Sequence, residues 1–161
     1  MRILVVYFSA TGITAKVANK LANIIKAERY DICPAVPYTR ADLDWTNKQS
    51  RSSVEMNDKT CRPKLLDYSA PIRAADVIFI GFPIWWYREP SIIDSFLEAY
   101  DFTGKVIIPF ATSGGSDFDE GTQKRISELS HAKVLSGKRF TDKTSGEELK
   151  EWAEKIIREG K

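Results

Sequence analysis

Phe8-Ser9-Ala10-Thr11-Gly12-Ile13-Thr14 is the stretch that decides the fold, because it joins an apolar run to a helical pattern. Before it, residues 2–8 are short, apolar and rich in β-branched and aromatic side chains, which is typical of a strand buried on both faces. After it, apolar residues recur at helical spacing on one face: Ile13, Val17, Leu21, Ile24 and Ile25. The stretch therefore predicts a strand that feeds a helix through a turn of small and hydroxyl residues.

The same alternation of strand and helix continues along the chain. Strands that alternate with helices five times imply a parallel sheet covered on both faces, with right-handed crossovers. Ser145 and Glu148 have the spacing of a capping box, which marks the start of the last helix. The further strands are expected at 29–33, 75–81, 105–110 and 133–140, and the further helices from Pro90, over about 119–129 and over 145–158.

Residues 34–70 interrupt this alternation, and we call them the excursion. The segment is polar, contains prolines, shows no sustained period and is too long for an ordinary connection in a compact domain. We expect an ordered excursion rather than a flexible loop, with Arg51 as a solvated loop residue. Its expected apolar anchors are Trp45, Val54, Met56 and Leu65-Leu66.

The first loop contains three hydroxyl side chains and one glycine, between a strand and the start of a helix. Free backbone N–H groups and the helix dipole favour an anion there, and hydroxyls add hydrogen bonds without adding charge. A phosphate monoester fits this chemistry, although an ordinary helix cap would use the same residue types. Neither the Walker pattern nor G-x-G-x-x-G is present. The loop consists of Ser9, Ala10, Thr11, Gly12, Ile13 and Thr14.

Two more buried strands end in distinctive loops. Pro83-Ile84-Trp85-Trp86-Tyr87 places large aromatic side chains in a row, which a flat aromatic ligand would cover by stacking; we expect one tryptophan to pack in the core. Thr112-Ser113-Gly114-Gly115 lets the backbone approach a ligand closely. In a parallel sheet all three loops share one edge, so together they predict a phosphate cradle, an aromatic wall and a backbone rim.

On these three motifs the chain resembles the flavodoxin-like family over nearly its whole length. The resemblance implies an α/β three-layer sandwich with a five-stranded parallel sheet, strand order 2-1-3-4-5, in a single domain over residues 1–161. In flavodoxins FMN lies non-covalently at the carboxyl edge of the sheet. The resemblance thus implies that the first loop holds the FMN phosphate, that residues 83–87 flank the isoalloxazine and that residues 112–115 rim its pyrimidine end.

Composition narrows the function. The net charge is +2, from 24 basic and 22 acidic residues that are scattered along the chain, so there is no nucleic-acid footprint. No apolar run approaches the roughly 20 residues of a membrane span, and residues 3–8 read as a buried strand rather than a signal core, so we expect a cytoplasmic protein. One histidine and two cysteines give no motif for a metal site or a catalytic side chain, and a flavin would supply the chemistry itself.

Two functions follow from this pattern. One is a redox protein that transfers electrons through bound FMN to a partner protein, which the family resemblance favours. The other is an FMN-dependent NAD(P)H oxidoreductase that reduces quinones or similar small acceptors. The balanced charge, the excursion and the tryptophan pair favour this second function, and whether the chain is an enzyme stays open at this point.

Overall fold

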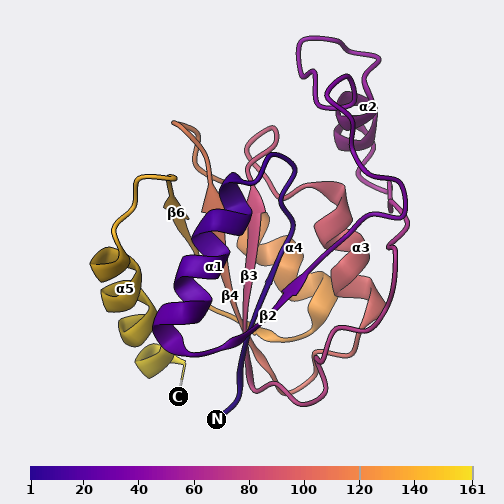
Figure 1. Ribbon diagram of the computed structural model, residues 1–161. Coiled ribbons are helices and arrows are strands. Elements are labelled where there is room, and N and C mark those ends of the chain that lie inside the picture. The colour runs from indigo at the N-terminus through magenta and orange to yellow at the C-terminus, as the bar shows by residue number, and fades with distance from the viewer. Residues whose placement is uncertain (120, 161) are drawn as a thin grey trace.

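A parallel sheet runs through the centre of the molecule, and helices cover both of its faces (Figure 1). The computed structural model describes residues 1–119 and 121–160. The predicted strand order is confirmed: neighbours follow the order β2-β1-β3-β4-β5, every pairing is parallel, and β6 pairs with β4. The strands are β1 (Ile3–Tyr7), β2 (Glu28–Asp31), β3 (Val77–Pro83), β4 (Val106–Thr112), β5 (Lys133–Val134) and β6 (Lys138–Phe140).

Each face of the sheet has its own helix pair. In β3, Val77 and Phe79 pack with residues of α1 and α5, whereas Ile78, Ile80 and Phe82 pack with residues of α3 and α4. Burial on both faces explains why the central strands are apolar at nearly every position. Each such side chain contributes roughly 1.5–3 kcal/mol by leaving water. The helices are α1 (Ile13–Ile25), α2 (Arg51–Asn57), α3 (Ser91–Ala99), α4 (Gly121–Ser130) and α5 (Gly146–Glu159).

The helix starts follow the sequence signals closely. Pro90 is the N-cap of α3, and the Ser145 hydroxyl accepts a hydrogen bond of 3.1 Å from the N–H of Glu148 at the start of α5. The predicted start of α4 included Glu120, which lies outside the described residues, as does Lys161 at the end of the predicted domain. Among the described residues, no helix has the length and apolarity needed to cross a membrane.

The last strand differs from its prediction. Two short strands, β5 and β6, lie where one strand over residues 133–140 was expected. Each residue of β5 pairs with the β4 residue 27 positions before it, whereas each residue of β6 pairs with the one 28 positions before it. One residue between the two strands therefore bulges out of the pairing. Pro109 in β4 has no N–H to donate at this point, and prolines inside sheets are confined to such irregular places. Gly137 fits the bulge because a Cβ there would lie 2.9 Å from the carbonyl oxygen of Pro109.

The excursion contains a helix, α2, which the sequence pattern did not predict. Its two ends pair with each other, since the N–H of Ala35 donates to Lys64 and the N–H of Leu66 donates to Cys33. Figure 1 shows it projecting beyond the carboxyl edge of the sheet. Three of the expected apolar anchors are wrong, because Trp45, Val54 and Leu66 are exposed, while Met56 and Leu65 are buried.

Polar and aromatic contacts anchor the excursion instead. Arg51, which we expected to be a solvated loop residue, takes part in these contacts. Its guanidinium carbon lies 3.8 Å from the centre of the Tyr38 ring, and its Nε donates to Glu55 over 3.0 Å. The Tyr38 ring in turn packs against Trp85, with ring centres 5.4 Å apart. The short α2 is capped by the Ser50 hydroxyl. Such side-chain contacts have no sequence period, so the pattern of apolar residues did not reveal them.

Candidate cofactor site

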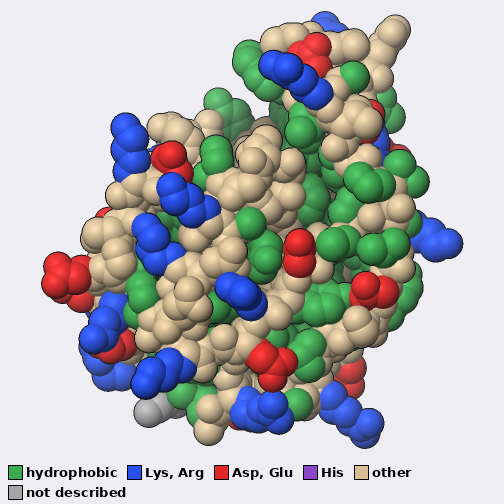
Figure 2. Space-filling model, viewed as in Figure 1, with side chains coloured by type: hydrophobic (Ala, Val, Ile, Leu, Met, Phe, Trp, Pro, Cys, Tyr) green, Lys and Arg blue, Asp and Glu red, His purple; other side chains and the backbone are tan. Residues whose placement is uncertain are grey.

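A cavity of about 700 Å³ lies at the carboxyl edge of the sheet, where the loops after β1, β3 and β4 meet the excursion. Figure 2 shows the excursion projecting above the body of the molecule, with hydrophobic side chains gathered beneath it. This volume lies in the range of ordinary small-molecule sites. Its lining residues are Ala10, Thr11, Leu43, Trp45, Ser52, Pro83, Ile84, Trp85, Trp86, Tyr87, Thr112, Ser113, Gly114 and Ser116.

The first loop leaves backbone donors free at the start of α1. The Ser9 hydroxyl accepts hydrogen bonds of 3.1 Å from the N–H groups of Gly12 and Ala15, which curls the loop around it. Gly12 has a φ of 95°, a left-handed conformation that favours glycine. Within the described residues, the N–H groups of Ile13 and Thr14 make no hydrogen bond. Donors of this kind at a helix N-terminus form an anion site.

Thr14 also ties the first loop to the end of β4. Its hydroxyl is 2.7 Å from the hydroxyl of Thr112, and both side chains are buried. A smaller cavity of about 170 Å³ adjoins this contact and reaches Ile13, Thr141 and Asp142. The hydroxyl pair therefore holds the start of α1 and the end of β4 in a fixed relation at the floor of the site.

The second loop is a tight hairpin from Trp85 to Arg88. The N–H of Trp85 donates to the Arg88 carbonyl over 3.0 Å, and the N–H of Arg88 donates back over 3.2 Å. The two residues at the tip, Trp86 and Tyr87, have φ values of 50° and 65°. Asn and Gly are the usual residues in such a turn, and a left-handed conformation costs a bulky residue roughly 1–2 kcal/mol.

The strained hairpin presents its aromatic side chains differently. Trp85 is half-buried: it packs edge-on against the core residue Phe8, with ring centres 5.7 Å apart, and it also lines the cavity, so one tryptophan packs against the core without being enclosed in it. Trp86 and Tyr87 remain 42% and 65% exposed while they line the cavity. Large aromatic surfaces held in contact with water at a cavity rim are available to a flat ligand.

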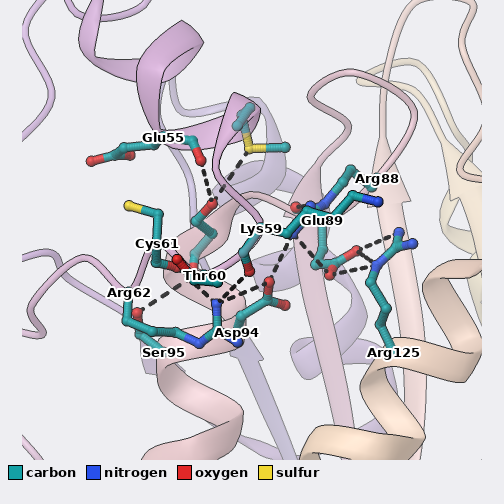
Figure 3. A network of polar contacts seen from close by, with 12 residues as sticks. Glu55, Lys59, Thr60, Cys61, Arg62, Arg88, Glu89, Asp94, Ser95 and Arg125 are labelled. Atoms are coloured by element: carbon teal, nitrogen blue, oxygen red, sulfur yellow. Dashed lines mark hydrogen bonds and ion pairs between the residues drawn. The ribbon is translucent and has the colours of Figure 1, made fainter.

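A buried ion network supports the base of the hairpin (Figure 3). The Arg88 Nη2 donates to Asp94 on α3 over 2.8 Å, and the fully buried Glu89 carboxylate accepts from Arg125 on α4 over 3.0 Å. Burial, together with the neighbouring Glu89 carboxylate, raises the pKa of Asp94 to about 8, although Arg88 opposes this shift. The network ties the hairpin to both helices of this face.

The sequence-predicted residues and the observed lining agree only in part. Ser9, Gly12 and Gly115 line neither cavity, while Ile13 and Thr14 line the smaller one; the other predicted residues line the larger. Sequence reasoning missed Leu43, Trp45, Ser52 and Ser116 in the larger cavity and Thr141 and Asp142 in the smaller. A tryptophan within an otherwise polar segment was the available signal for the missed wall, but we expected Trp45 to be an anchor.

Comparisons with known proteins agree with this geometry. The family model described as Flavodoxin matches residues 2–156. The chain belongs to the flavodoxin family. The crystal structure of a candidate flavoprotein from Bacteroides eggerthii DSM 20697 is similar at 43% identity and a TM-score of 0.89, covering 97% of this chain and 98% of that one. One from Bacteroides uniformis ATCC 8492 has 44% identity and a TM-score of 0.88, covering 95% and 97%.

A more distant structure shares the fold alone. It is a flavoprotein from Lactobacillus acidophilus NCFM, solved in complex with FMN, with 21% identity and a TM-score of 0.66, covering 94% of this chain and 98% of that one. No curated protein matches the chain.

As a member of the flavodoxin family, the chain is an FMN protein, and its site fits that cofactor. The free N–H groups of Ile13 and Thr14 suit the phosphate, and the exposed Trp86 and Tyr87 suit a flat ring. Gly114 has no atom within 4 Å of the place where a Cβ would stand, which leaves its backbone open to a ligand. Among the described residues, no charged side chain lines the larger cavity, which is compatible with a neutral ring.

Proposed function

We propose that this protein transfers electrons through FMN bound in the cavity at the carboxyl edge of the sheet. The observation that carries the proposal is the meeting of two features across two adjoining cavities, which share Thr11, Pro83 and residues 112–114 of their lining. A helix start with free N–H groups lies at one end, and a strained hairpin with exposed aromatic side chains lies at the other. Only a ligand with both an anionic group and a flat ring uses both features.

The first loop would hold the phosphate. The N–H groups of Ile13 and Thr14 would donate to its oxygens, with the hydroxyl of Thr11, which is exposed beside them. Ser9 and Gly12 would act indirectly, because the Ser9 hydroxyl shapes the loop and Gly12 supplies its left-handed turn. Since these donors are neutral, binding relies on directed hydrogen bonds and on the dipole of α1 rather than on a lysine or arginine.

The hairpin and the third loop would hold the ring. Trp86 and Tyr87 would stack against one face and exclude water from it, while Pro83 and Ile84 would complete that wall, with Trp85 behind them. The backbone of residues 112–115 would rim the pyrimidine end. Bound FMN supplies the one- and two-electron redox chemistry, so the protein itself needs only to bind, orient and shield the ring.

A second function, an FMN-dependent oxidoreductase that reduces a small acceptor, is favoured by one specific observation. The excursion adds Leu43, Trp45 and Ser52 to the lining of the same cavity. A carrier that docks on a partner protein gains nothing from a wall that restricts access to the flavin ring. An enzyme with a small substrate does benefit, because the wall can enclose that substrate.

The test of FMN binding compares the wild-type protein with two variants, Trp86→Ala and Tyr68→Ala. Apoprotein is titrated with FMN, and flavin fluorescence reports binding. Trp86→Ala should weaken binding about tenfold, since a lost stacking contact of roughly 1.4 kcal/mol corresponds to that factor. Tyr68→Ala removes a comparably exposed aromatic side chain of the excursion that does not line the cavity, so it should bind like wild type. A wild-type protein that binds no FMN would overturn the proposal.

The choice between carrier and oxidoreductase needs a second measurement. NADH or NADPH is added to the FMN-loaded protein without oxygen, and the visible spectrum is followed. Bleaching of the flavin within a turnover time supports the oxidoreductase. A flavin that stays oxidised, yet is reduced by dithionite, supports the carrier and directs the search toward protein partners.

A further inference from the structure

Arg125 on α4 contacts two of the loops that surround the cavity, although it lines neither cavity itself. Its Nε and Nη2 donate side by side to the buried carboxylate of Glu89 at the base of the hairpin, over 3.2 and 3.0 Å (Figure 3). The same Nη2 donates to Asp119 over 3.1 Å, and Asp119 belongs to the loop after β4. Because Ser113 and Gly114 of that loop line the cavity, one guanidinium joins the two loops from outside the cavity.

A backbone hydrogen bond links the same two loops at the tip of the hairpin. The N–H of Asp119 donates to the carbonyl of Tyr87 over 2.7 Å. Tyr87 and Glu89 are two positions apart, so this segment is held to Asp119 twice. One connection is the Tyr87 backbone, and the other runs from the Glu89 side chain through Arg125. These contacts form a closed ring, and the two loops can separate only if both connections break.

Arginine is suited to this bridge by its shape. Its planar guanidinium presents several N–H donors in a fixed fork that matches a carboxylate. Two donors grip Glu89, and Nη2 also reaches Asp119 and, over 3.1 Å, the hydroxyl of Thr122. The Glu89 side chain is fully buried and needs a cationic partner, whereas the Asp119 side chain is 47% exposed. Arg125→Lys would compensate the charge of Glu89, but a single ammonium cannot reproduce the fork.

The support of the hairpin matters because its tip is strained. Trp86 and Tyr87 line the cavity with left-handed φ values, and such conformations persist only where the surrounding structure holds them. At the base of the hairpin, Arg88 donates to Asp94 of α3 over 2.8 Å, so the base is held from α3 as well as from α4. Of these two connections, the one through Arg125 also includes the loop after β4.

We propose that Arg125 is a positioning residue that holds the aromatic hairpin and the loop after β4 at the separation that the flavin ring requires. This inference rests on the proposed FMN binding and adds a residue that lies outside the cavity. Within the described chain, the hydrogen bonds of the Arg125 side chain reach Glu89, Asp119 and Thr122, and none reaches the first loop. Its effect is therefore confined to the ring end of the cofactor, whereas the phosphate end depends on the start of α1.

The first experiment compares FMN with riboflavin, which has the same ring but no phosphate. Apoprotein is titrated with each flavin, and flavin fluorescence reports binding. Arg125→Lys should weaken the binding of both flavins about tenfold, which corresponds to about 1.4 kcal/mol, because the fork is lost. The ratio of the two affinities should stay at the wild-type value. Gly12→Ala, at the phosphate end, should weaken FMN binding and leave riboflavin binding unchanged.

A matched control and a second variant make the test specific to the bridge. Lys124→Gln changes the neighbouring cation of α4, which is exposed and pairs with Glu128 of the same helix, so it should bind both flavins like wild type. Asp119→Ala removes the other end of the bridge at a half-exposed position, and it carries the same test if Arg125→Lys fails to fold. The double variant should bind flavin no more weakly than Arg125→Lys alone, because both changes break one bridge.

The second experiment needs no flavin. Amide hydrogen exchange is followed by NMR in the apoprotein at Arg88, whose N–H closes the hairpin, and at Asp119, whose N–H donates to Tyr87. Both amides should exchange about tenfold faster in Arg125→Lys, because local opening becomes easier when the bridge is lost. The Glu148 amide, which donates to the Ser145 hydroxyl at the start of α5, should keep its wild-type rate. A general loss of stability would instead speed all three amides alike.

The outcomes separate this inference from the function on which it rests. Wild-type exchange rates at Arg88 and Asp119 in Arg125→Lys would overturn the inference, whether or not FMN binds. Equal acceleration at Glu148 would also overturn it, because Arg125 would then serve only the stability of the whole fold. Faster exchange at the two loop amides with unchanged flavin affinity would refute the link to the ring. A wild-type protein that binds no FMN refutes the proposed function, and the exchange rates still decide whether Arg125 joins the loops.

Discussion

Replacing Asp94 with Asn should remove a strong pH dependence from the stability of the protein. Asp94 is buried at the start of α3, where it faces Arg88 and Glu89 of the hairpin and, at 4.0 Å, Arg62 of the excursion. One of its oxygens, Oδ1, has no hydrogen-bond partner within the described chain. Burial, the largest cause, and the neighbouring Glu89 carboxylate raise its pKa to about 8, so at neutral pH the folded protein keeps a proton on this carboxyl.

The sign and size follow from proton linkage. Between the ordinary pKa of 3.8 and the folded pKa of about 8, the folded state binds one more proton than the unfolded state, so stability falls as pH rises. A gap of about 4 units corresponds to roughly 5 kcal/mol across the window, or about 1.4 kcal/mol for each pH unit inside it. This is a large part of the 5–15 kcal/mol typical of a whole domain.

The assay is urea unfolding of the apoprotein at pH 5, 6, 7, 8 and 9. Asp94→Asn keeps the acceptor toward Arg88 but cannot ionise, so wild type should lose stability relative to this variant as pH rises to about 8. Asp101→Asn is the matched control, because the pKa of exposed Asp101 is lowered by hydrogen bonds from Thr103 and it stays ionised over this range. Parallel pH profiles for wild type and Asp94→Asn would refute the reasoning.

Three further predictions follow: two concern the floor of the site, and the third concerns the remote helix α5. Gly12→Ala should lower the unfolding free energy by roughly 1–2 kcal/mol and weaken FMN binding, because φ is 95°; unchanged values in urea and flavin titrations would contradict this. Thr14→Val should cost about 1–2 kcal/mol by orphaning the buried Thr112 hydroxyl, and a double-mutant cycle with Thr112→Val should show that the two losses are not additive. Ser145→Ala should lower stability by about 1 kcal/mol through loss of the α5 cap while FMN affinity stays at the wild-type value, which thermal melts and titrations measure together.

Most of the helices and strands could be predicted from local patterns in the sequence. The buried strands, the helix face of α1 and the cap at Ser145 are set by side-chain spacing and by residue type within a few positions. Strand order followed from the resemblance and is confirmed. The bulge between β5 and β6 was not predicted, because it depends on Pro109, which belongs to the neighbouring strand. A strand does not reveal from its own residues which partner it meets.

The sequence by itself determined the three loops that surround the cavity, since each follows directly from a recognisable strand. Tertiary structure alone decided that Trp45 and Ser52 reach the same cavity and that Arg62 and Arg125 join Arg88, Glu89 and Asp94 in a buried network. The physical reason is range. Hydrophobic periodicity reports which face of an element is buried, whereas a wall built from the excursion and an ion network shared by α3, α4 and a hairpin depend on contacts between segments far apart in the chain, which no local pattern encodes.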